Sequence, residues 1–317
     1  MSGNTGPNED SEPRAVQWAP LAGIWSFEGR SVAYQSPTSG TTLPYGLAVS
    51  NVRLRDGRVG VSITFGSLED GARGNPAAGV VLGYQGERAS YVLPQLGAYG
   101  SAYAIARYEP ALGWVAEVRA GSVRNLRAGH TYEVEVVQTG QQVRLSVDGV
   151  PIFSHVLSEP LAGSQLGLFA WGEARVDFSH FTWEQRQPRA FVAMQFSEPY
   201  NTLYREVILP KAQHLGFEVR RIDEVSKPGI IFEDIKRELA ESKVVIAEIT
   251  APNQNVFYEL GYAHALNKPT ILLAQRGHEL PFDIRSYRVI FYDDSIAGKP
   301  TVERDLEKHL RAVMSDS

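Results

Sequence analysis

The sequence predicts a two-domain protein, an antiparallel β-sandwich followed by an α/β domain with a five-stranded parallel sheet. The chain has 317 residues, whereas single domains commonly contain about 100 to 200 residues. Up to about residue 184, apolar and polar residues alternate with a period of two and no segment shows helical periodicity. After residue 188, short apolar runs alternate with helix-length segments, which is the pattern of a parallel sheet with helical crossovers.

The composition excludes several kinds of chemistry. The chain contains no Cys, which removes disulfide scaffolds, thiolate metal sites and cysteine nucleophiles. It has 31 basic and 36 acidic residues, so we expect no chain-wide attraction to nucleic acid. Residues 1–17 are polar and predict a disordered tail rather than a secretory signal. No apolar run reaches the length of a transmembrane helix, and a cytoplasmic protein without membrane contact is expected.

Residues 18–184 are predicted to form the β-sandwich. Three dipeptides, Asp56-Gly57, Thr139-Gly140 and Asp148-Gly149, are typical of hairpin turns. Many short strands separated by such turns indicate a sandwich or a barrel. The clearest alternating strands are residues 58–65, 132–136 and 143–147.

The middle of this half is rich in aromatic residues. They could line a face that binds a sugar or another ligand, or they could pack between strands and hairpins, which is the more common use of such side chains. A signalling ligand or a carbohydrate is therefore a candidate partner of this domain. These residues are Tyr84, Tyr91, Tyr99, Tyr103, Tyr108 and Trp114.

A linker at 185–188 precedes the α/β domain, which is predicted to span residues 189–317. Five strands alternating with helices over about 130 residues fit the flavodoxin-like strand order 2-1-3-4-5 best. The expected strands are residues 190–194, 217–222, 243–249, 269–274 and 287–292. The expected helices are residues 199–215, 230–241, 256–266 and 302–313.

The candidate ligand site of this domain lies beyond the carboxyl ends of its first and third strands. Open α/β sheets bind ligands at the point where the strand order reverses, which for the order 2-1-3 is between those two strands. Backbone amides at helix starts near this point could hold phosphate. The residues predicted to bind substrate there are Gln195, Phe196, Ser197, Asp223, Ser226, Gly229, Thr250, Asn253, Asn255 and Tyr258.

One carboxylate, Glu259, stands out on the helix that follows the third strand. Asn255 is predicted to be the N-cap, which places Glu259 at the fourth helical position. Its neighbours three and four residues away are Val256, Tyr262 and Ala263, so no basic side chain pairs with it along the helix. A lone buried carboxylate can act as a nucleophile or stabilise a cation. The alternative is a first-turn acid favoured by the helix dipole, with its carboxylate in water.

Residues 189–292 resemble the nucleoside 2-deoxyribosyltransferase-like and TIR-like superfamily. The most specific match is the string Asn-Val-x-Tyr-Glu-Leu-Gly-x-Ala at 255–263, supported by the strands at 190–196 and 244–250 and by the segments 228–231 and 281–283. The resemblance implies that Glu259 is the catalytic carboxylate, which attacks or electrostatically supports the anomeric carbon of a ribosyl group.

The resemblance alone does not decide between a nucleoside and NAD as the substrate. The transferases place an acidic residue about six positions before the catalytic glutamate, and this chain has Asn253 there. An amide cannot protonate a departing base, whereas nicotinamide leaves NAD as a neutral molecule and needs little acid assistance. We therefore expect an NAD glycohydrolase, with NAD as substrate rather than cofactor. The resemblance implies a regulated effector of antiphage defence that forms homo-oligomers.

Two other functions stay open at this point. One is a nucleoside or nucleotide N-glycosidase or a 2-deoxyribosyltransferase, and the other is a module that binds a nucleotide signal without catalysis. No metal site is expected, because none of the seven His forms a metal-ligand pair at helical spacing and no GxxxxGK[ST] loop occurs.

The N-terminal half resembles, more weakly, the concanavalin-like and laminin-G-like jelly rolls. The match is carried by residues 143–152, 167–170 and 176–181. It implies a fold and not an activity, since the acidic ExDxxE spacing of some jelly-roll glycosidases is absent. A role as sensor or oligomerisation domain follows from this interpretation.

Overall fold

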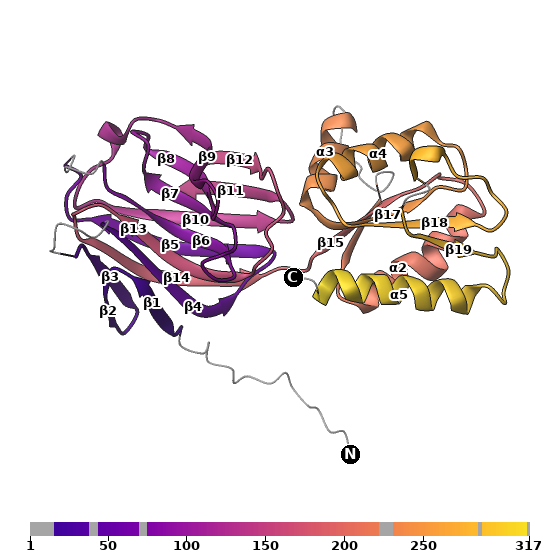
Figure 1. The fold of residues 1–317 in the computed structure, drawn as a ribbon, viewed down its shortest axis with the longest axis horizontal. Helices are drawn as coiled ribbons and strands as arrows, with labels where there is room; N and C mark the ends of the chain where they lie inside the picture. The colour runs from indigo at the N-terminus through magenta and orange to yellow at the C-terminus, as the bar shows by residue number, and fades with distance from the viewer. Residues whose placement is uncertain (1–15, 38–43, 70–74, 222–230, 285–286, 316–317) are drawn as a thin grey trace, which may run out of the picture.

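The computed structural model describes all residues except 1–15, 38–43, 70–74, 222–230, 285–286 and 316–317. Almost all of the predicted tail at 1–17 therefore lies outside the described residues. Figure 1 shows an all-β half, drawn in indigo to magenta, followed by an α/β half in orange and yellow. Strand β14 continues through Gln185, so the connection between the halves is one residue shorter than predicted and spans residues 186–188.

The N-terminal half is a sandwich of two seven-stranded antiparallel sheets. Alternate residues of the two inner faces form one large apolar core between them. The first sheet has the order β1 (Trp18–Ala22), β4 (Tyr45–Arg53), β13 (Gln165–Trp171), β6 (Ala77–Tyr84), β7 (Tyr91–Gly97), β8 (Tyr103–Glu109) and β9 (Gly113–Ala120). The second has the order β12 (Val150–Val156), β11 (Gln142–Val147), β10 (Thr131–Thr139), β5 (Gly57–Phe65), β14 (Val176–Gln185), β3 (Ser31–Gln35) and β2 (Ile24–Glu28). A short 3-10 helix, η1 (Val123–Asn125), lies between β9 and β10.

Two of the three predicted hairpins are confirmed. Asp148 and Gly149 connect β11 to β12 with φ angles of 51° and 75°, as a two-residue turn with left-handed residues requires. Thr139 pairs with Gln142 across the turn between β10 and β11. Local sequence signals were sufficient for these two turns.

The third predicted hairpin, at Asp56-Gly57, is wrong. The strands on either side of it, β4 and β5, belong to different sheets, so the dipeptide lies in a crossover between sheets. The Asp56 carboxylate is buried and accepts a hydrogen bond from the backbone N–H of Gly140 at 2.5 Å. Asp56 thus fixes a neighbouring hairpin instead of forming one.

The C-terminal half contains a five-stranded parallel sheet in the predicted order, second-first-third-fourth-fifth. Its strands are, in spatial order, β16 (Glu218–Arg221), β15 (Arg189–Ala193), β17 (Ser242–Glu248), β18 (Thr270–Gln275) and β19 (Val289–Tyr292). Helices α3 (Ile231–Glu241) and α4 (Gln254–Ala265) cover one face of the sheet. The other face is covered by α5 (Lys299–Ser315) and by a continuous helical segment made of α1 (Tyr200–Leu203), the π-helical turn η2 (Tyr204–Ile208) and α2 (Leu209–His214).

The turn between β10 and β11 contacts the end of α3 and joins the two halves. The backbone N–H of Gln141 donates to the carbonyl of Ala240 at 3.0 Å, and the buried Lys268 ammonium donates to the same carbonyl at 2.7 Å. The buried Glu241 carboxylate bonds both Arg144 of the sandwich and Arg189 of the parallel sheet. Backbone and ionic contacts therefore fix α3 to the sandwich.

Gly140→Ala is expected to weaken this junction. A Cβ at Gly140 would lie 2.7 Å from the carbonyl of Ala240 and from the backbone of Glu241, and the φ of 57° disfavours any other residue. We expect a loss of about 1–3 kcal/mol in unfolding free energy, measured by urea denaturation. Gly149→Ala is the matched control, because it has a φ of 75° with no atom within 4 Å of its Cβ. Equal losses in the two variants would mean that the contact itself contributes nothing.

No helix among the described residues is long and apolar enough to cross a membrane.

Candidate functional site

The candidate site lies at the carboxyl ends of β15 and β17, where the strand order reverses. Beyond β15, the Gln195 side-chain amide donates to the Ser197 hydroxyl at 2.8 Å. Beyond β17, the buried Thr250 hydroxyl accepts a hydrogen bond from the backbone N–H of Gln275 at 2.8 Å. These predicted residues lie at the expected edge of the sheet. Asp223, Ser226 and Gly229, predicted for the same edge, lie outside the described residues.

Glu259 lies on α4 and faces the sheet. It is 4% exposed and belongs to the buried side of the helix together with Val256, Leu260 and Ala263. The sheet face beneath α4 carries small side chains near the ends of two strands, Ala193 on β15 and Ala247 on β17. The helical spacing that makes an apolar stripe thus places one carboxylate among apolar neighbours.

The N-cap of α4 is Asn253, so the prediction of Asn255 is wrong. Asn253 has extended backbone angles, and its side-chain oxygen accepts a hydrogen bond from the backbone N–H of Asn255 at 2.9 Å. The helix begins at Gln254, which puts Glu259 at the sixth helical position rather than the fourth. Glu259 is therefore in the second turn, beyond the strongest part of the helix dipole.

Asn253→Ala is expected to destabilise the C-terminal half by about 1 kcal/mol, because it removes the cap. Asn255→Ala, at an exposed position two residues away, should leave stability within about 0.5 kcal/mol of the wild type. Urea denaturation followed by circular dichroism at 222 nm measures both, since all the α-helices of the described residues belong to this half. Equal effects at the two positions would contradict the assignment of the cap.

Burial raises the pKa of the Glu259 carboxyl to about 7, and this desolvation is the only contribution to the shift. Among the described residues, no side chain forms a hydrogen bond or ion pair with this carboxylate. A first-turn acid with its carboxylate in water would be exposed, so that alternative is contradicted by the position and burial of Glu259. The arrangement leaves a desolvated carboxylate that a cation can stabilise.

Two predicted residues on α4 do not share this buried side. Tyr258 is 49% exposed, and Asn255 is also exposed. His264, on the same helix, stacks on Tyr287 with ring centroids 4.4 Å apart. These side chains are arranged around the helix rather than on the face that carries Glu259.

A second buried carboxylate, Glu248, was not predicted. It is the last residue of β17, and its Oε1 accepts hydrogen bonds from the hydroxyl of Thr250 and, at 3.1 Å, from the hydroxyl of Tyr292. Its Oε2 is buried without a partner among the described residues, and burial raises its pKa. Because residues alternate along a strand, Glu248 shares the sheet face of Val244 and Ile246, the face covered by α5. The signal in the sequence that could have identified Glu248 is an acidic residue at the end of an apolar strand.

A buried cation, Arg221, is the second residue that the sequence did not reveal. It ends β16 and is 9% exposed. Its guanidinium lies 4.2 Å from the ring centroid of Tyr204 and 5.3 Å from that of the predicted site residue Phe196, and it donates to the Asn201 side chain at 2.9 Å. Arginine on aromatic faces is suited to binding phosphate oxygens. Arg221 thus ends its strand at the same edge of the sheet as the candidate site, but on the side covered by the α1–α2 segment and α5, whereas Glu259 lies on the side covered by α4.

Among the described residues there is no group of three or more His, Asp or Glu that could hold a metal ion.

Comparison with known proteins gives likenesses of fold. No family model matches the chain, and neither does any curated protein. The carbohydrate-binding module CBM66 from Bacillus subtilis is 15% identical, with a TM-score of 0.44 over 53% of this chain and 94% of that chain. The galectin LEC-6 from Caenorhabditis elegans is 14% identical, with a TM-score of 0.31 over 47% of this chain and 95% of that one. The TIR domain of the Toll-related receptor TRR-2 from Hydra magnipapillata is 17% identical, with a TM-score of 0.33 over 38% of this chain and 97% of that domain. Each of these likenesses covers only part of this chain.

Proposed function

We propose that the C-terminal half cleaves the N-glycosidic bond between nicotinamide and ribose in NAD, with Glu259 as the catalytic carboxylate. The observation that carries this proposal is the burial of Glu259 without a basic partner among the described residues, on the helix that borders the ligand-binding edge of the sheet. The resemblance of residues 255–263 to the superfamily motif points to the same residue.

The chemistry fits a desolvated carboxylate. When the bond from C1 of the ribose to the pyridinium nitrogen breaks, its electron pair goes to that nitrogen, nicotinamide leaves neutral, and positive charge develops on the ribose. A carboxylate on the opposite face can stabilise this charge or trap it covalently, as in retaining glycosidases. Water then adds to C1 and releases a proton, giving ADP-ribose. Attraction between the carboxylate and the cationic ribose is strongest where water is excluded.

Arg221 and Asn253 have supporting roles in this proposal. In this proposal the diphosphate of NAD extends across the edge of the sheet to Arg221, which ends β16 on the side covered by α5. The Asn253 side chain caps α4 through its oxygen. As an amide, it cannot protonate a leaving group. Departure of nicotinamide does not require such a donor, because the leaving group already carries the positive charge.

A nucleoside N-glycosidase or deoxyribosyltransferase is the second candidate, and Glu248 is the observation in its favour. A neutral base needs a proton as it leaves, and burial, which raises the pKa of Glu248, favours the protonated carboxyl that could supply one. Glu248 faces the side of the sheet covered by α5, whereas Glu259 lies on the side covered by α4. This separation makes NAD cleavage the preferred proposal.

Unrestrained cleavage of NAD would kill the host cell, so we further propose that the activity is regulated and belongs to antiphage defence. The sandwich is the candidate regulatory domain. Its β10–β11 turn contacts the end of α3, and α3 packs beside α4 on the same face of the sheet. Assembly into homo-oligomers is part of the same proposal.

The test is product analysis after incubation of the full chain with NAD at several protein concentrations. We expect nicotinamide and ADP-ribose in equal amounts by liquid chromatography. A parallel incubation with deoxynucleosides and a second free base detects base exchange, which would support the second candidate instead. If a nucleotide binds by calorimetry and no bond is cleaved in either assay, the chain is a non-catalytic binding module and both enzymatic proposals fail.

A further inference from the structure

The outer face of the first sheet of the sandwich carries an apolar cluster separate from the core. Along β7, Val92 and Leu96 point into the core between the sheets, while Tyr91 and Leu93 point to the outer face. The exterior of a sandwich is ordinarily polar, because only the inner faces pack together. The outer cluster consists of Leu47, Val49, Val81, Tyr84, Tyr91, Leu93 and Phe169, with Tyr45, Tyr108, Trp114 and Trp171 packed against it.

Aromatic rings cover part of this face by contacting one another. Tyr91 stacks on Tyr108 with centroids 5.0 Å apart, and Trp114 meets Phe169 edge to face at 5.1 Å. Of the aromatic residues singled out in the sequence, Tyr84, Tyr91, Tyr108 and Trp114 therefore lie on the outer face, whereas Tyr103 packs against the core.

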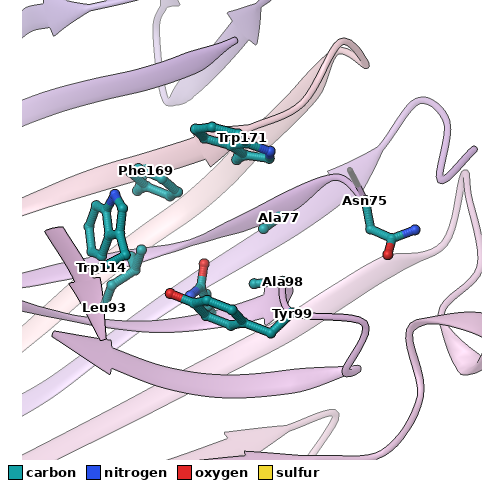
Figure 2. Close-up of a pocket in the computed structure, with 9 residues that line it drawn as sticks. Asn75, Ala77, Leu93, Ala98, Tyr99, Trp114, Phe169 and Trp171 are labelled. Atoms are coloured by element: carbon teal, nitrogen blue, oxygen red, sulfur yellow. The ribbon is translucent and has the colours of Figure 1, made fainter. Parts of the chain in front are cut away.

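A pocket of about 270 Å3 opens at one end of this cluster. In Figure 2 the rings of Trp114, Trp171 and Tyr99 are arranged around a space, with the small side chains of Ala77 and Ala98 between them. The lining comes from β6, β7, β9 and β13 and from the segments before β6 and after β7. It consists of Asn75, Ala77, Leu93, Gln95, Ala98, Tyr99, Trp114, Phe169 and Trp171.

One polar side chain in this pocket, Gln95, has no hydrogen-bond partner among the described residues. It lies within β7 opposite Gly79 of β6, lines the pocket and is only 2% exposed. Its amide atoms are not among the side-chain atoms that are sealed from solvent without a partner, so they face the open pocket. A ligand with hydroxyl groups that enters the pocket would give this amide the hydrogen bonds that the protein does not.

The rim of the pocket has an unusual backbone. Ala98 and Tyr99 have φ angles of 74° and 52°, in the left-handed region that residues other than glycine rarely occupy. This conformation holds the Tyr99 ring at the rim, 42% exposed, with the guanidinium of Arg119 5.9 Å from its centroid. Such backbone conformations persist where the surrounding structure enforces them, often at ligand sites.

We propose that this pocket binds one ring of a neutral saccharide. A sugar ring has an apolar face of C–H groups, which stacks on Trp and Tyr, and an edge of hydroxyl groups, which Gln95 and Asn75 can bind. None of the described residues that line the pocket is Asp, Glu, Lys or Arg, so a charged ligand would find no counter-ion among them. A purely apolar ligand would leave the Gln95 amide without partners. The volume is at the small end of ligand sites, which suits a single ring.

The proposal is tested with the full chain and a panel of neutral sugars, namely lactose, maltotriose, cellotriose, xylotriose, mannotriose and inulobiose. Binding is followed by tryptophan fluorescence, because two of the five Trp line the pocket, and by calorimetry. We expect at least one sugar to bind with a millimolar or lower Kd. Gln95→Leu should weaken that binding about tenfold or more without lowering the midpoint of urea unfolding, because the Gln95 amide makes no hydrogen bond to the described residues that the substitution would break.

Tyr99→Gly is the second variant, since it deletes the stacking ring and relieves the left-handed backbone. It should also weaken binding about tenfold while the unfolding midpoint stays the same or rises. Gln138→Leu, at a buried glutamine of β10 in the other sheet, is the matched control and should bind as the wild type does. The proposal is overturned if no sugar of the panel binds at a concentration of about 10 mM, or if binding survives both Gln95→Leu and Tyr99→Gly.

Discussion

Glu259→Gln is expected to lower NAD cleavage by about a thousandfold or more, with nicotinamide release as the measurement. Glutamine keeps the size and burial of the side chain but cannot stabilise the cationic ribose or form a glycosyl ester. The KM for NAD should change little, because the carboxylate acts on charge that develops only in the transition state. A loss of kcat without loss of binding distinguishes a catalytic role from a structural one.

The matched control for this substitution is Glu238→Gln. Glu238 is also a buried carboxylate of the C-terminal half, and burial also raises its pKa. It lies near the end of α3, where its backbone carbonyl accepts a hydrogen bond from Ser242 at the first residue of β17. This is the opposite edge of the sheet from the candidate site, so Glu238→Gln should retain activity. Full activity in Glu259→Gln, or equal losses in both variants, would contradict the assigned role.

The pH dependence of stability gives the second large effect. In the folded protein the pKa of Glu259 is raised to about 7 from the ordinary value of 4.5, so folding favours its protonated form. Its ionisation costs the folded state nothing below about pH 4.5, a growing amount between pH 4.5 and 7, and about 3 kcal/mol above pH 7. Glu259→Gln should therefore be more stable than the wild type by about 3 kcal/mol at pH 8 and nearly equal to it at pH 4.5.

Urea unfolding at the two pH values tests this expectation on the full chain. All five Trp lie before residue 184, so tryptophan fluorescence follows the sandwich, whereas the signal at 222 nm follows the helices of the C-terminal half. The difference should appear in the helical signal alone. Glu279→Gln, at an exposed carboxylate of the same half, should give no pH-dependent difference. A gap between Glu259→Gln and wild type that is the same at both pH values would mean that Glu259 does not titrate as its burial implies.

Periodicity was enough to predict the two kinds of sheet, but not every local detail. The order of the parallel strands was predicted because the flavodoxin-like order is common for five strands alternating with helices, and the structure has that order. The N-cap of α4 was misassigned because Asn253 and Asn255 both suit that position, and only the backbone angles of Asn253 decide between them. The dipeptide Asp56-Gly57 has the same sequence signal as a true hairpin turn, although β4 and β5 on either side of it belong to different sheets.

The candidate sites depend on partners that are distant in the sequence, which limits prediction from local patterns. Glu259 could be identified from the sequence because the positions that could hold a basic partner, three and four residues away on the same helix, are all occupied by uncharged residues. Glu248 could not, because its contact with Tyr292 joins residues 44 positions apart. The sandwich pocket likewise combines strands that are far apart in the chain, and the burial of Gln95 depends on all of them.

The ion pairs that Glu241 forms with both halves of the chain affect which form of the protein is suitable for experiments. Its carboxylate takes one arginine from each half, and the neighbouring Ala240 carbonyl takes one hydrogen bond from each half. A truncated protein beginning at residue 189 would lack Arg144 and the Gln141 amide, and would carry a half-neutralised carboxylate at a newly exposed helix end. An inactive or unstable fragment would then say little about Glu259, so the excised C-terminal half is a poor substitute for the intact chain in every assay of catalysis.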